Sequence, residues 1–469
     1  MNRWSVLVWS ILLFVSVGLA GQQGNQQVGV VVKAGRILDV RTGVYQEHQL
    51  ILIAGGRIRA VGEERELQAQ VPSSARVVDL SCCTVLPGLI DAHTHLTMSP
   101  YLTSPRARAV SAPRQALLGA RNARITLEAG FTTTRDVGAS GYADVALRDA
   151  INAGDVPGPR MLASGPPIGS QSTPCEEDRL APQFHFFAGE QAGGVFAAMA
   201  RVREDVRCGA DLIKFYATGG VLSQGDDPER EQYSPEEMQT IAQMAHRLSR
   251  KVAAHAHGAK GIKDAVLAGV DSIEHGSFVD DADIRLMKQH GTYLVPTLYV
   301  GDWFLENQAK LGFSQDTLAK AKIVVAASRQ NVPRAFREKV KVAFGTDAGV
   351  YPHGLNAREF SVMVKLGLTP LAAIQSATLH AADLLGWADR VGTLEPGKYA
   401  DLIAVEGNPL KDVTTLEKVK VVMKGGEVVQ DTRERKGMRR KSDLDEPQAM
   451  PETGYGQGKT SDGQRTKAN

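Results

Sequence analysis

Five short apolar runs, spread over most of the chain, each lead into a histidine, a lysine or an aspartate. They are Gly88-Leu89-Ile90-Asp91-Ala92-His93-Thr94-His95, Ala210-Asp211-Leu212-Ile213-Lys214, Val252-Ala253-Ala254-His255-Ala256-His257, Ser272-Ile273-Glu274-His275 and Val342-Ala343-Phe344-Gly345-Thr346-Asp347. A polar residue at the carboxyl end of successive apolar strands is typical of a (β/α)8 barrel, which carries its chemistry at that end. The pattern therefore constrains the fold and the location of a site together.

The middle of the chain alternates strand-like with helix-like stretches, which indicates a parallel sheet covered or closed by helices. Helices are expected at 113–129, 235–249 and 280–290, and Ser234-Pro235 followed by two acids is a helix start. Strands are expected at 89–93, 131–135, 160–164, 211–216, 251–256, 271–275, 292–296 and 341–346. Eight strands in this alternation predict an α/β fold of the (β/α)8 TIM barrel type, over residues 87–393.

Both ends of the chain look different from the middle. Short β-branched runs with hairpin turns lie within 21–86, where Gly55-Gly56 separates two of them, and the same texture returns within 394–431 around Gly425-Gly426. We therefore predict one small β-sandwich domain built from both termini, with 369–385 as the last helix before the chain returns to it.

Two terminal segments fall outside these domains. Residues 1–20 carry an early arginine, an apolar stretch and a small-x-small end, as a secretory signal does. The predicted location is therefore periplasmic or secreted, and an uncleaved membrane anchor is the alternative. Residues 432–469 are polar and basic with few apolar side chains, which predicts a disordered tail. In an exported protein a bridge between Cys175 and Cys208 is conceivable, but connectivity does not follow from sequence.

His93 and His95 are two residues apart on an expected strand, so their side chains share a face. Two imidazoles placed in this way suit a metal ion, and zinc favours nitrogen ligands. Lys214 is the exception in the set, because a lysine at the end of an apolar strand is costly unless it is paired or modified. Addition of CO2 to its amine would give a carbamate, an anionic oxygen donor able to bridge two metals. A snorkelling or ion-paired lysine is the alternative.

His255 and His257 again share a strand face, and only one of them is needed as a ligand. His275 is expected on the next strand and Asp347 on the last. A carboxylate in that position can bind a metal and exchange a proton with an attacking water. His257, inward but not required as a ligand, is predicted to polarise the substrate carbonyl or stabilise its oxyanion.

With these motifs the chain resembles the amidohydrolase superfamily over roughly residues 28–430. Within it, Ile213-Lys214-Phe215-Tyr216-Ala217-Thr218-Gly219-Gly220 and Gln232-Tyr233-Ser234 look like the metal-dependent dipeptidase branch, with its Xaa-Pro and Xaa-basic dipeptidases and ochratoxin-type amidases. The resemblance implies a binuclear centre, most simply two Zn²⁺ ions. It also implies ligand roles: His93 and His95 on one metal with Asp347, His255 and His275 on the other, and carboxylated Lys214 between them.

The predicted reaction is hydrolysis of a peptide or N-acyl amino acid whose leaving amino acid has a free carboxylate. Tyr216, two residues after Lys214, is a candidate substrate contact, although an aromatic lining the barrel is equally compatible. Arg230 and Tyr233 in the following loop are candidates to bind the carboxylate, since arginine pairs with carboxylates in bidentate fashion. The alternative is that Arg230 pairs with Asp226 or Asp227 on the surface.

Two other functions remain open from sequence. A cyclic amidase resembling imidazolonepropionase would use one metal and would not need Lys214, so the metal count separates it from the binuclear reading. A non-catalytic scaffold on the same fold should have lost ligands, whereas all six are present. The formal charge of +2 argues against a nucleic-acid partner. A small molecule or dipeptide is therefore the expected partner, and the choice between monomer and homo-oligomer is open.

Overall fold

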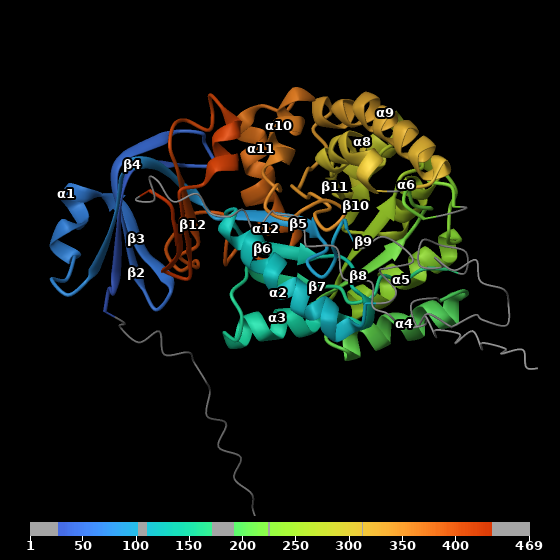
Figure 1. Cartoon of the computed structure of the whole chain (residues 1–469), viewed down its shortest axis with the longest axis horizontal. Helices are drawn as coiled ribbons and strands as arrows, with labels where there is room; N and C mark the ends of the chain where they lie inside the picture. Colours follow the sequence, from blue (N-terminus) through green and yellow to red (C-terminus); the bar gives the residue numbers. More distant parts are fainter. Residues whose placement is uncertain (1–26, 102–109, 171–191, 224–225, 312, 434–469) are drawn as a thin grey trace, which may run out of the picture.

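The computed structural model describes residues 27–101, 110–170, 192–223, 226–311 and 313–433 (Figure 1). The predicted signal segment, nearly all of the predicted tail and one cysteine of the conceivable bridge, Cys175, lie outside these residues. The export signal, the disordered tail and the Cys175–Cys208 bridge therefore stay predictions.

One seven-stranded sheet draws its strands from both ends of the chain and lies on the left of Figure 1. Its order is β14-β13-β12-β4-β1-β2-β3, and β4 pairs with β12 in antiparallel fashion. The strands are β1 (Val30–Leu38), β2 (Tyr45–Ala54), β3 (Arg57–Glu63), β4 (Arg76–Pro87), β12 (Leu402–Val405), β13 (Val421–Lys424) and β14 (Glu427–Asp431). A short helix α1 (Glu64–Leu67) and a 3₁₀ turn (Gln68–Gln70) follow β3.

The two glycine-pair hairpins are confirmed. Gly55 and Gly56 join β2 to β3 with φ of 56° and 75°, and Gly425 and Gly426 join β13 to β14 with φ of 58° and 81°. Positive φ at both central residues is the geometry of a tight hairpin turn, which glycine adopts without strain. The described strands from both ends are hydrogen-bonded into this single sheet, and the predicted sandwich stays a prediction.

Seven strands between the two ends form two parallel sheets, of order β5-β6-β7 and β8-β9-β10-β11. Their bounds are β5 (Leu89–Thr94), β6 (Phe131–Asp136), β7 (Arg160–Ala163), β8 (Leu212–Tyr216), β9 (Lys251–Ala256), β10 (Ser272–His275) and β11 (Tyr293–Val295). Helices alternate with them as α2 (Ala112–Glu128), α3 (Ala143–Ala153), α4 (Val195–Arg207), α5 (Pro235–Arg247), α6 (Ala259–Ala268) and α7 (Asp281–His290). The chain is thus an α/β protein, and every predicted strand from 89 to 296 is confirmed.

The predicted strand at 341–346 is the exception, since it forms only an isolated bridge at Val342, with a second at Ala348. Gly345 lies so close to β5 that a Cβ there would be 2.8 Å from the Cβ of His93, and the backbone leaves the extended region at Asp347. The segment still hydrogen-bonds on both sides, Ala343 N to Leu294 O at 3.0 Å and Ala92 N to Phe344 O at 2.8 Å. It therefore lies between β11 and β5 and links the edges of the two parallel sheets.

The predicted helix start at Ser234 is confirmed, because the Ser234 hydroxyl accepts from Glu237 N and the Glu237 carboxylate accepts from Ser234 N. This reciprocal capping begins α5, which packs against β9. The predicted helix at 369–385 is present as α11 (Pro370–Gln375), one π-helical turn (Ser376–His380) and α12 (Ala381–Leu384). The remaining helices are a 3₁₀ turn (Ser140–Tyr142), α8 (Tyr299–Leu311), α9 (Gln315–Arg337), α10 (Arg358–Lys365) and a 3₁₀ turn (Val413–Lys418).

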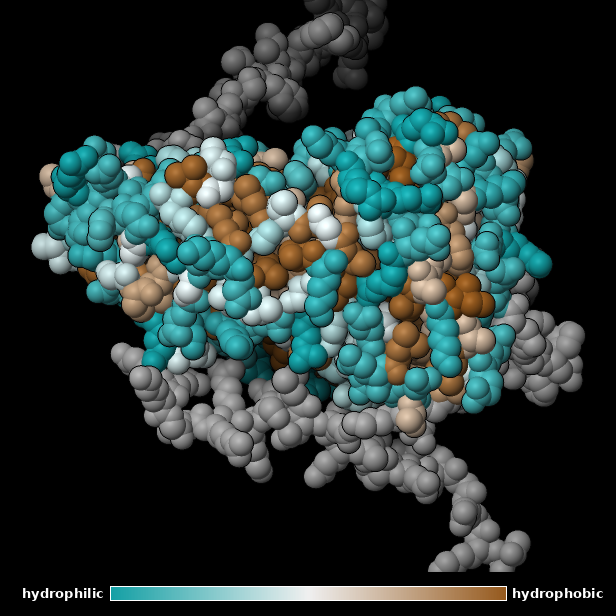
Figure 2. Space-filling model, turned by 90° about the horizontal axis from the view of Figure 1, so that it is seen from above, coloured by the Kyte–Doolittle hydropathy of each residue, from teal (hydrophilic) through white to brown (hydrophobic). Residues whose placement is uncertain are grey.

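The surface of the described residues carries both hydrophilic and hydrophobic areas. Hydrophilic residues cover most of the face in Figure 2, and hydrophobic residues gather in a band across its middle and in a second group on the right. No helix within the described ranges combines the length and the apolar character needed to cross a bilayer.

Candidate metal centre

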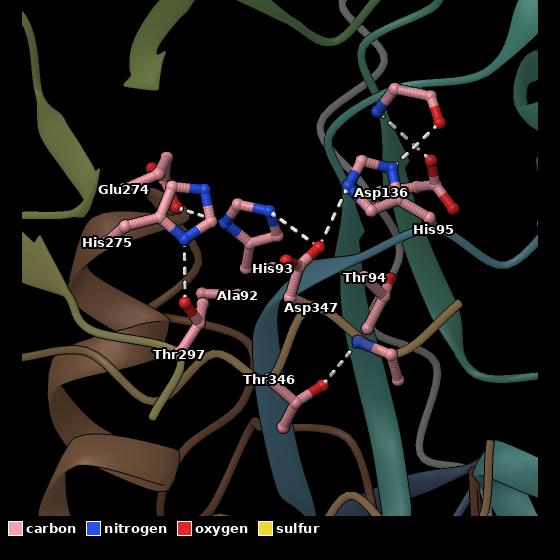
Figure 3. A network of polar contacts seen from close by, with 12 residues as sticks. Ala92, His93, Thr94, His95, Asp136, Glu274, His275, Thr297, Thr346 and Asp347 are labelled. Carbon is pink, nitrogen blue, oxygen red and sulfur yellow. Dashed lines mark hydrogen bonds and ion pairs between the residues drawn. The ribbon is translucent and has the colours of Figure 1, made fainter. Parts of the chain in front are cut away.

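His93, His95 and Asp347 form the first part of the site, at the end of β5. Backbone hydrogen bonds from Asp347 N to His93 O (2.7 Å) and from His95 N to Ala348 O (2.8 Å) hold the two segments together. As a result, one carboxylate oxygen of Asp347 lies 3.5 Å from His93 Nε2 and 3.3 Å from His95 Nε2, between the two rings (Figure 3). A local HxH pattern and a residue more than 250 positions away therefore make one cluster.

His255, His257 and His275 form the second part, at the ends of β9 and β10. One ring nitrogen from each of the three lies within 4.8 Å of the others, and the same limit holds for His93, His275 and Asp347. His275 belongs to both groups and so connects them. His257, assigned from sequence to the substrate rather than to a metal, is thus within the donor cluster.

Two of these residues have backbones that side-chain-bearing residues seldom adopt. The φ of His275 is 72° and that of Asp347 is 61°, both in the left-handed region. Such conformations cost of order 1–3 kcal/mol each and persist where the surrounding structure enforces them. Here they turn the imidazole and the carboxylate into the cluster at the carboxyl end of the strands.

Each of the five histidines has one ring nitrogen held by a partner from the protein. Nδ1 is held in four of them, by Glu274 Oε2 for His93 (2.7 Å), Gly138 O for His95 (3.0 Å), Ser277 Oγ for His257 (2.8 Å) and Thr297 Oγ1 for His275 (2.7 Å). His255 instead uses Nε2, toward Gly219 O at 3.2 Å. Metal-binding histidines are oriented in this way, with the second nitrogen left for the ion. The donor set therefore fits divalent cations.

The protonation of three of the histidines and of Asp347 agrees with this arrangement. Burial lowers the pKa of His257 to about 4 and lowers the pKa values of His255 and His275 well below their ordinary range, so these imidazoles are neutral at neutral pH. Burial alone would raise the pKa of Asp347, but hydrogen bonds and charge from His93 and His95 bring it well below the usual value. Neutral imidazole and ionised carboxylate are the forms that coordinate metals.

Lys214 is the central residue of β8, is only 3% exposed and lines the same cavity. An ammonium in this position faces several imidazoles in a setting of low dielectric, which is unfavourable unless an anion compensates it or the amine is modified. Tyr216, two residues on, is half-buried, lines the cavity and has its ring 5.1 Å from that of His255. Tyr216 therefore lies where a substrate contact was predicted.

A cavity of about 240 Å³ opens onto the cluster. Its walls include His93, His95, Lys214, Tyr216, His255, His257, His275 and Asp347. Two predicted substrate contacts are not brought to it. Arg230 is exposed on the surface, and Tyr233 is buried with its hydroxyl donating to Ala192 O at 2.8 Å and its ring against Phe215. Neither residue is among the described lining of the cavity, and their predicted contact with a substrate carboxylate stays a prediction.

Glu274 and Arg135 are functional residues that sequence reasoning missed. Glu274 Oε2 holds His93 Nδ1, and its Oε1 accepts from Arg135 Nη2 at 2.7 Å and from Ser272 Oγ at 2.5 Å. Burial alone would raise the pKa of Glu274, but the guanidinium of Arg135 and the bond to His93 lower it to about 2. A charged residue directly before His275 on a buried strand was the available signal.

We expect Arg135→Met to destabilise the protein by about 3–5 kcal/mol, because it leaves the fully buried carboxylate of Glu274 without its cation. Denaturant unfolding would measure the change. Arg59→Met, on an exposed position of β3, is the matched control and should leave the unfolding free energy unchanged. Adding Glu274→Gln to Arg135→Met should recover part of the loss. An unchanged unfolding free energy in Arg135→Met would show that Glu274 is compensated elsewhere.

Comparison with known proteins identifies the family. A sequence model described as the amidohydrolase family matches residues 84–429. Ochratoxinase of Aspergillus niger is 34% identical over 373 residues, covering 73% of this chain and 75% of that one. Imidazolonepropionase of Pseudomonas fluorescens (strain Pf0-1) is 26% identical over 395 residues, covering 77% and 89%.

Among solved structures, a Xaa-Pro dipeptidase with methionine bound in its active site superposes with a TM-score of 0.80 at 38% identity, covering 85% of this chain and 99% of that one. The resemblance drawn from the motifs is thereby confirmed, for the family and for its ochratoxinase and dipeptidase relatives.

Proposed function

We propose, from the premise that this chain belongs to the amidohydrolase family and hydrolyses amide bonds, that it is a binuclear metal-dependent hydrolase of dipeptides or N-acyl amino acids. The observation that carries the proposal is the cluster itself. Five neutral or hydrogen-bond-oriented histidines, one carboxylate and one buried lysine converge on a single cavity. One tetrahedral ion needs fewer donors than this.

The residues present suit two ions. His93, His95 and Asp347 would hold one, His255 and His275 the other, and Lys214, as its carbamate, would bridge them. Divalent ions bound there, most simply Zn²⁺, would polarise the scissile carbonyl and make water a better nucleophile. We infer that the linked parallel sheets form a closed (β/α)8 barrel, which would place all of these residues at its carboxyl end.

The chain's own groups would move the proton. Asp347 lies between His93 and His95 with an ionised carboxylate, so it can accept a proton from the attacking water and return it to the leaving nitrogen. His257 is neutral, and Ser277 fixes its ring, so it can be directed at the carbonyl oxygen. Water adds across the amide C–N bond, so the products are a carboxylic acid and an amine.

We expect metal analysis of fully loaded protein to give two equivalents per chain. The reason is that the donors fall into two groups sharing His275, which one ion of ordinary coordination number would not use fully. The measurement is metal content by mass spectrometry after loading and removal of loose ions. Saturation at one equivalent would favour the alternative function, a mononuclear cyclic amidase like the imidazolonepropionase relative, and would count against the dipeptidase proposal.

The activity itself is tested with a panel of dipeptides and N-acyl amino acids, with imidazolone propionate as the competing substrate. Turnover of the open-chain amides that chelator abolishes and added metal restores would support the proposal. Turnover of the cyclic amide alone would contradict the proposal and favour the cyclic amidase.

A further inference from the structure

One wall of the cavity is made by α8 and α9, a helix pair that follows β11. It is apolar, and the two helices pack closely, since a Cβ at Gly301 would be 2.6 Å from Val325 Cγ2. Its apolar residues include Val300, Phe304, Ala321 and Val324, and Arg329 lies among them. Among the described residues that line the cavity, Arg329 is the single arginine, on an otherwise uncharged wall.

Arg329 is only partly used by the protein. Its Nη2 donates to Leu298 O at 3.2 Å and to Asp302 Oδ1, whereas Nη1 is buried and has no hydrogen-bond partner among the described residues. Nε makes no hydrogen bond to any described residue either. A guanidinium carries five N–H donors, and an unpaired buried donor costs about 1–3 kcal/mol. The unused donors therefore favour a ligand that accepts hydrogen bonds.

The side chain is also held in place before any ligand arrives. Glu359 accepts from Leu298 N at 2.8 Å and from Tyr299 N at 2.6 Å, so the start of α8 is fixed from one side while Arg329 holds Leu298 O. A guanidinium that is already oriented loses little conformational entropy when it binds an anion. Arg230, by contrast, is exposed on a loop.

We infer that Arg329 binds the free carboxylate of the substrate, and that the apolar wall around it receives the side chain of the same amino acid. The inference rests on the proposed function and specifies its substrate: a dipeptide or N-acyl amino acid with a carboxylate and an apolar side chain on the leaving residue. Arginine suits this role because its planar donors match a carboxylate in bidentate geometry. Among the described residues of this wall that line the cavity, only Arg329 is charged, so it is the group with which the substrate carboxylate can form an ion pair there.

Kinetics with matched substrates test the inference. Wild-type protein should prefer alanyl-leucine over alanyl-leucinamide, and Arg329→Gln should lose about 10- to 100-fold in kcat/KM for the acid but little for the amide. Arg59→Gln, at an exposed position of β3, is the control for surface charge. Asp302→Asn is the control for structure, because it removes the ion pair with Arg329 and leaves the guanidinium in the wall. Both controls should retain the preference for the acid.

Calorimetric binding of small molecules tests the inference independently of catalytic turnover. L-Leucine, the expected product, should bind wild-type protein about tenfold more tightly than L-leucinamide in calorimetry, and Arg329→Gln should bind both alike. An equal Kd for the two probes in wild-type protein overturns the carboxylate site, even if amides are hydrolysed. Loss of the preference in Asp302→Asn as well assigns Arg329 a structural role and overturns it too. Selective binding without any amide turnover leaves the carboxylate site standing and counts against the proposed function alone.

Discussion

Asp347→Asn lowers kcat by about 10²- to 10⁴-fold in the proposed mechanism, the range expected when a general acid–base group is lost. The carboxamide keeps the shape of the side chain and its place between His93 and His95, but it cannot take the proton from water or return it to the leaving nitrogen. The measurement is kcat and KM for the best dipeptide substrate, with metal content determined on the same sample. A kcat within a few-fold of wild type would remove Asp347 from proton transfer.

His257→Asn is the matched comparison, because it changes a residue of the same cluster. If His257 acts on the carbonyl, the variant loses less activity than Asp347→Asn and keeps both metals. The structure makes this comparison sharper, since His257 contributes a nitrogen to the same donor group as His255 and His275. Equal loss of metal in the two variants would make His257 a ligand and would require a new assignment of the oxyanion contact.

The second large effect is expected at Lys214. Lys214→Ala should abolish most activity and reduce the bound metal by one equivalent, because no other described cavity residue can supply a bridging carbamate. Acetate or propionate should restore part of both, since a small carboxylate can enter the space left by the side chain and donate oxygen to the metals.

Two controls keep that result interpretable. Lys251→Ala, on the neighbouring strand β9 but outside the cavity lining, should retain metal and activity. Asp347→Asn should gain nothing from added carboxylate, because its carboxamide still fills the space that a small carboxylate would need. Full activity in Lys214→Ala would show that the lysine is only structural and would favour the mononuclear alternative.

The strands and their polar ends follow from local rules. Apolar runs of strand length predicted β5 to β11, and the two-residue period placed His93 and His95 on one face, because side chains alternate along any strand. Capping and hairpin chemistry were equally local, as Ser234 and Gly55-Gly56 show. The family resemblance carried the ligand set, which the structure brings together in one cluster.

Failures of sequence reasoning occurred where a side chain's direction depends on distant backbone. Asp347 was expected on a strand, yet close approach at Gly345 and a left-handed φ end the extended backbone there. Arg230 and Tyr233 follow β8 in sequence, yet neither is among the described residues that line the cavity. Loop geometry of this kind is set by packing, not by composition.

The sequence by itself determined the α/β alternation, the carboxyl-end placement of the polar residues and the family, because periodicity and short motifs act over a few residues. Only the tertiary structure decided which groups support and complete the site. Glu274 meets His93 across 181 positions, and Arg329 reaches the cavity from a helix that no motif marked. Such contacts arise when strands and helices pack, so no local pattern encodes them.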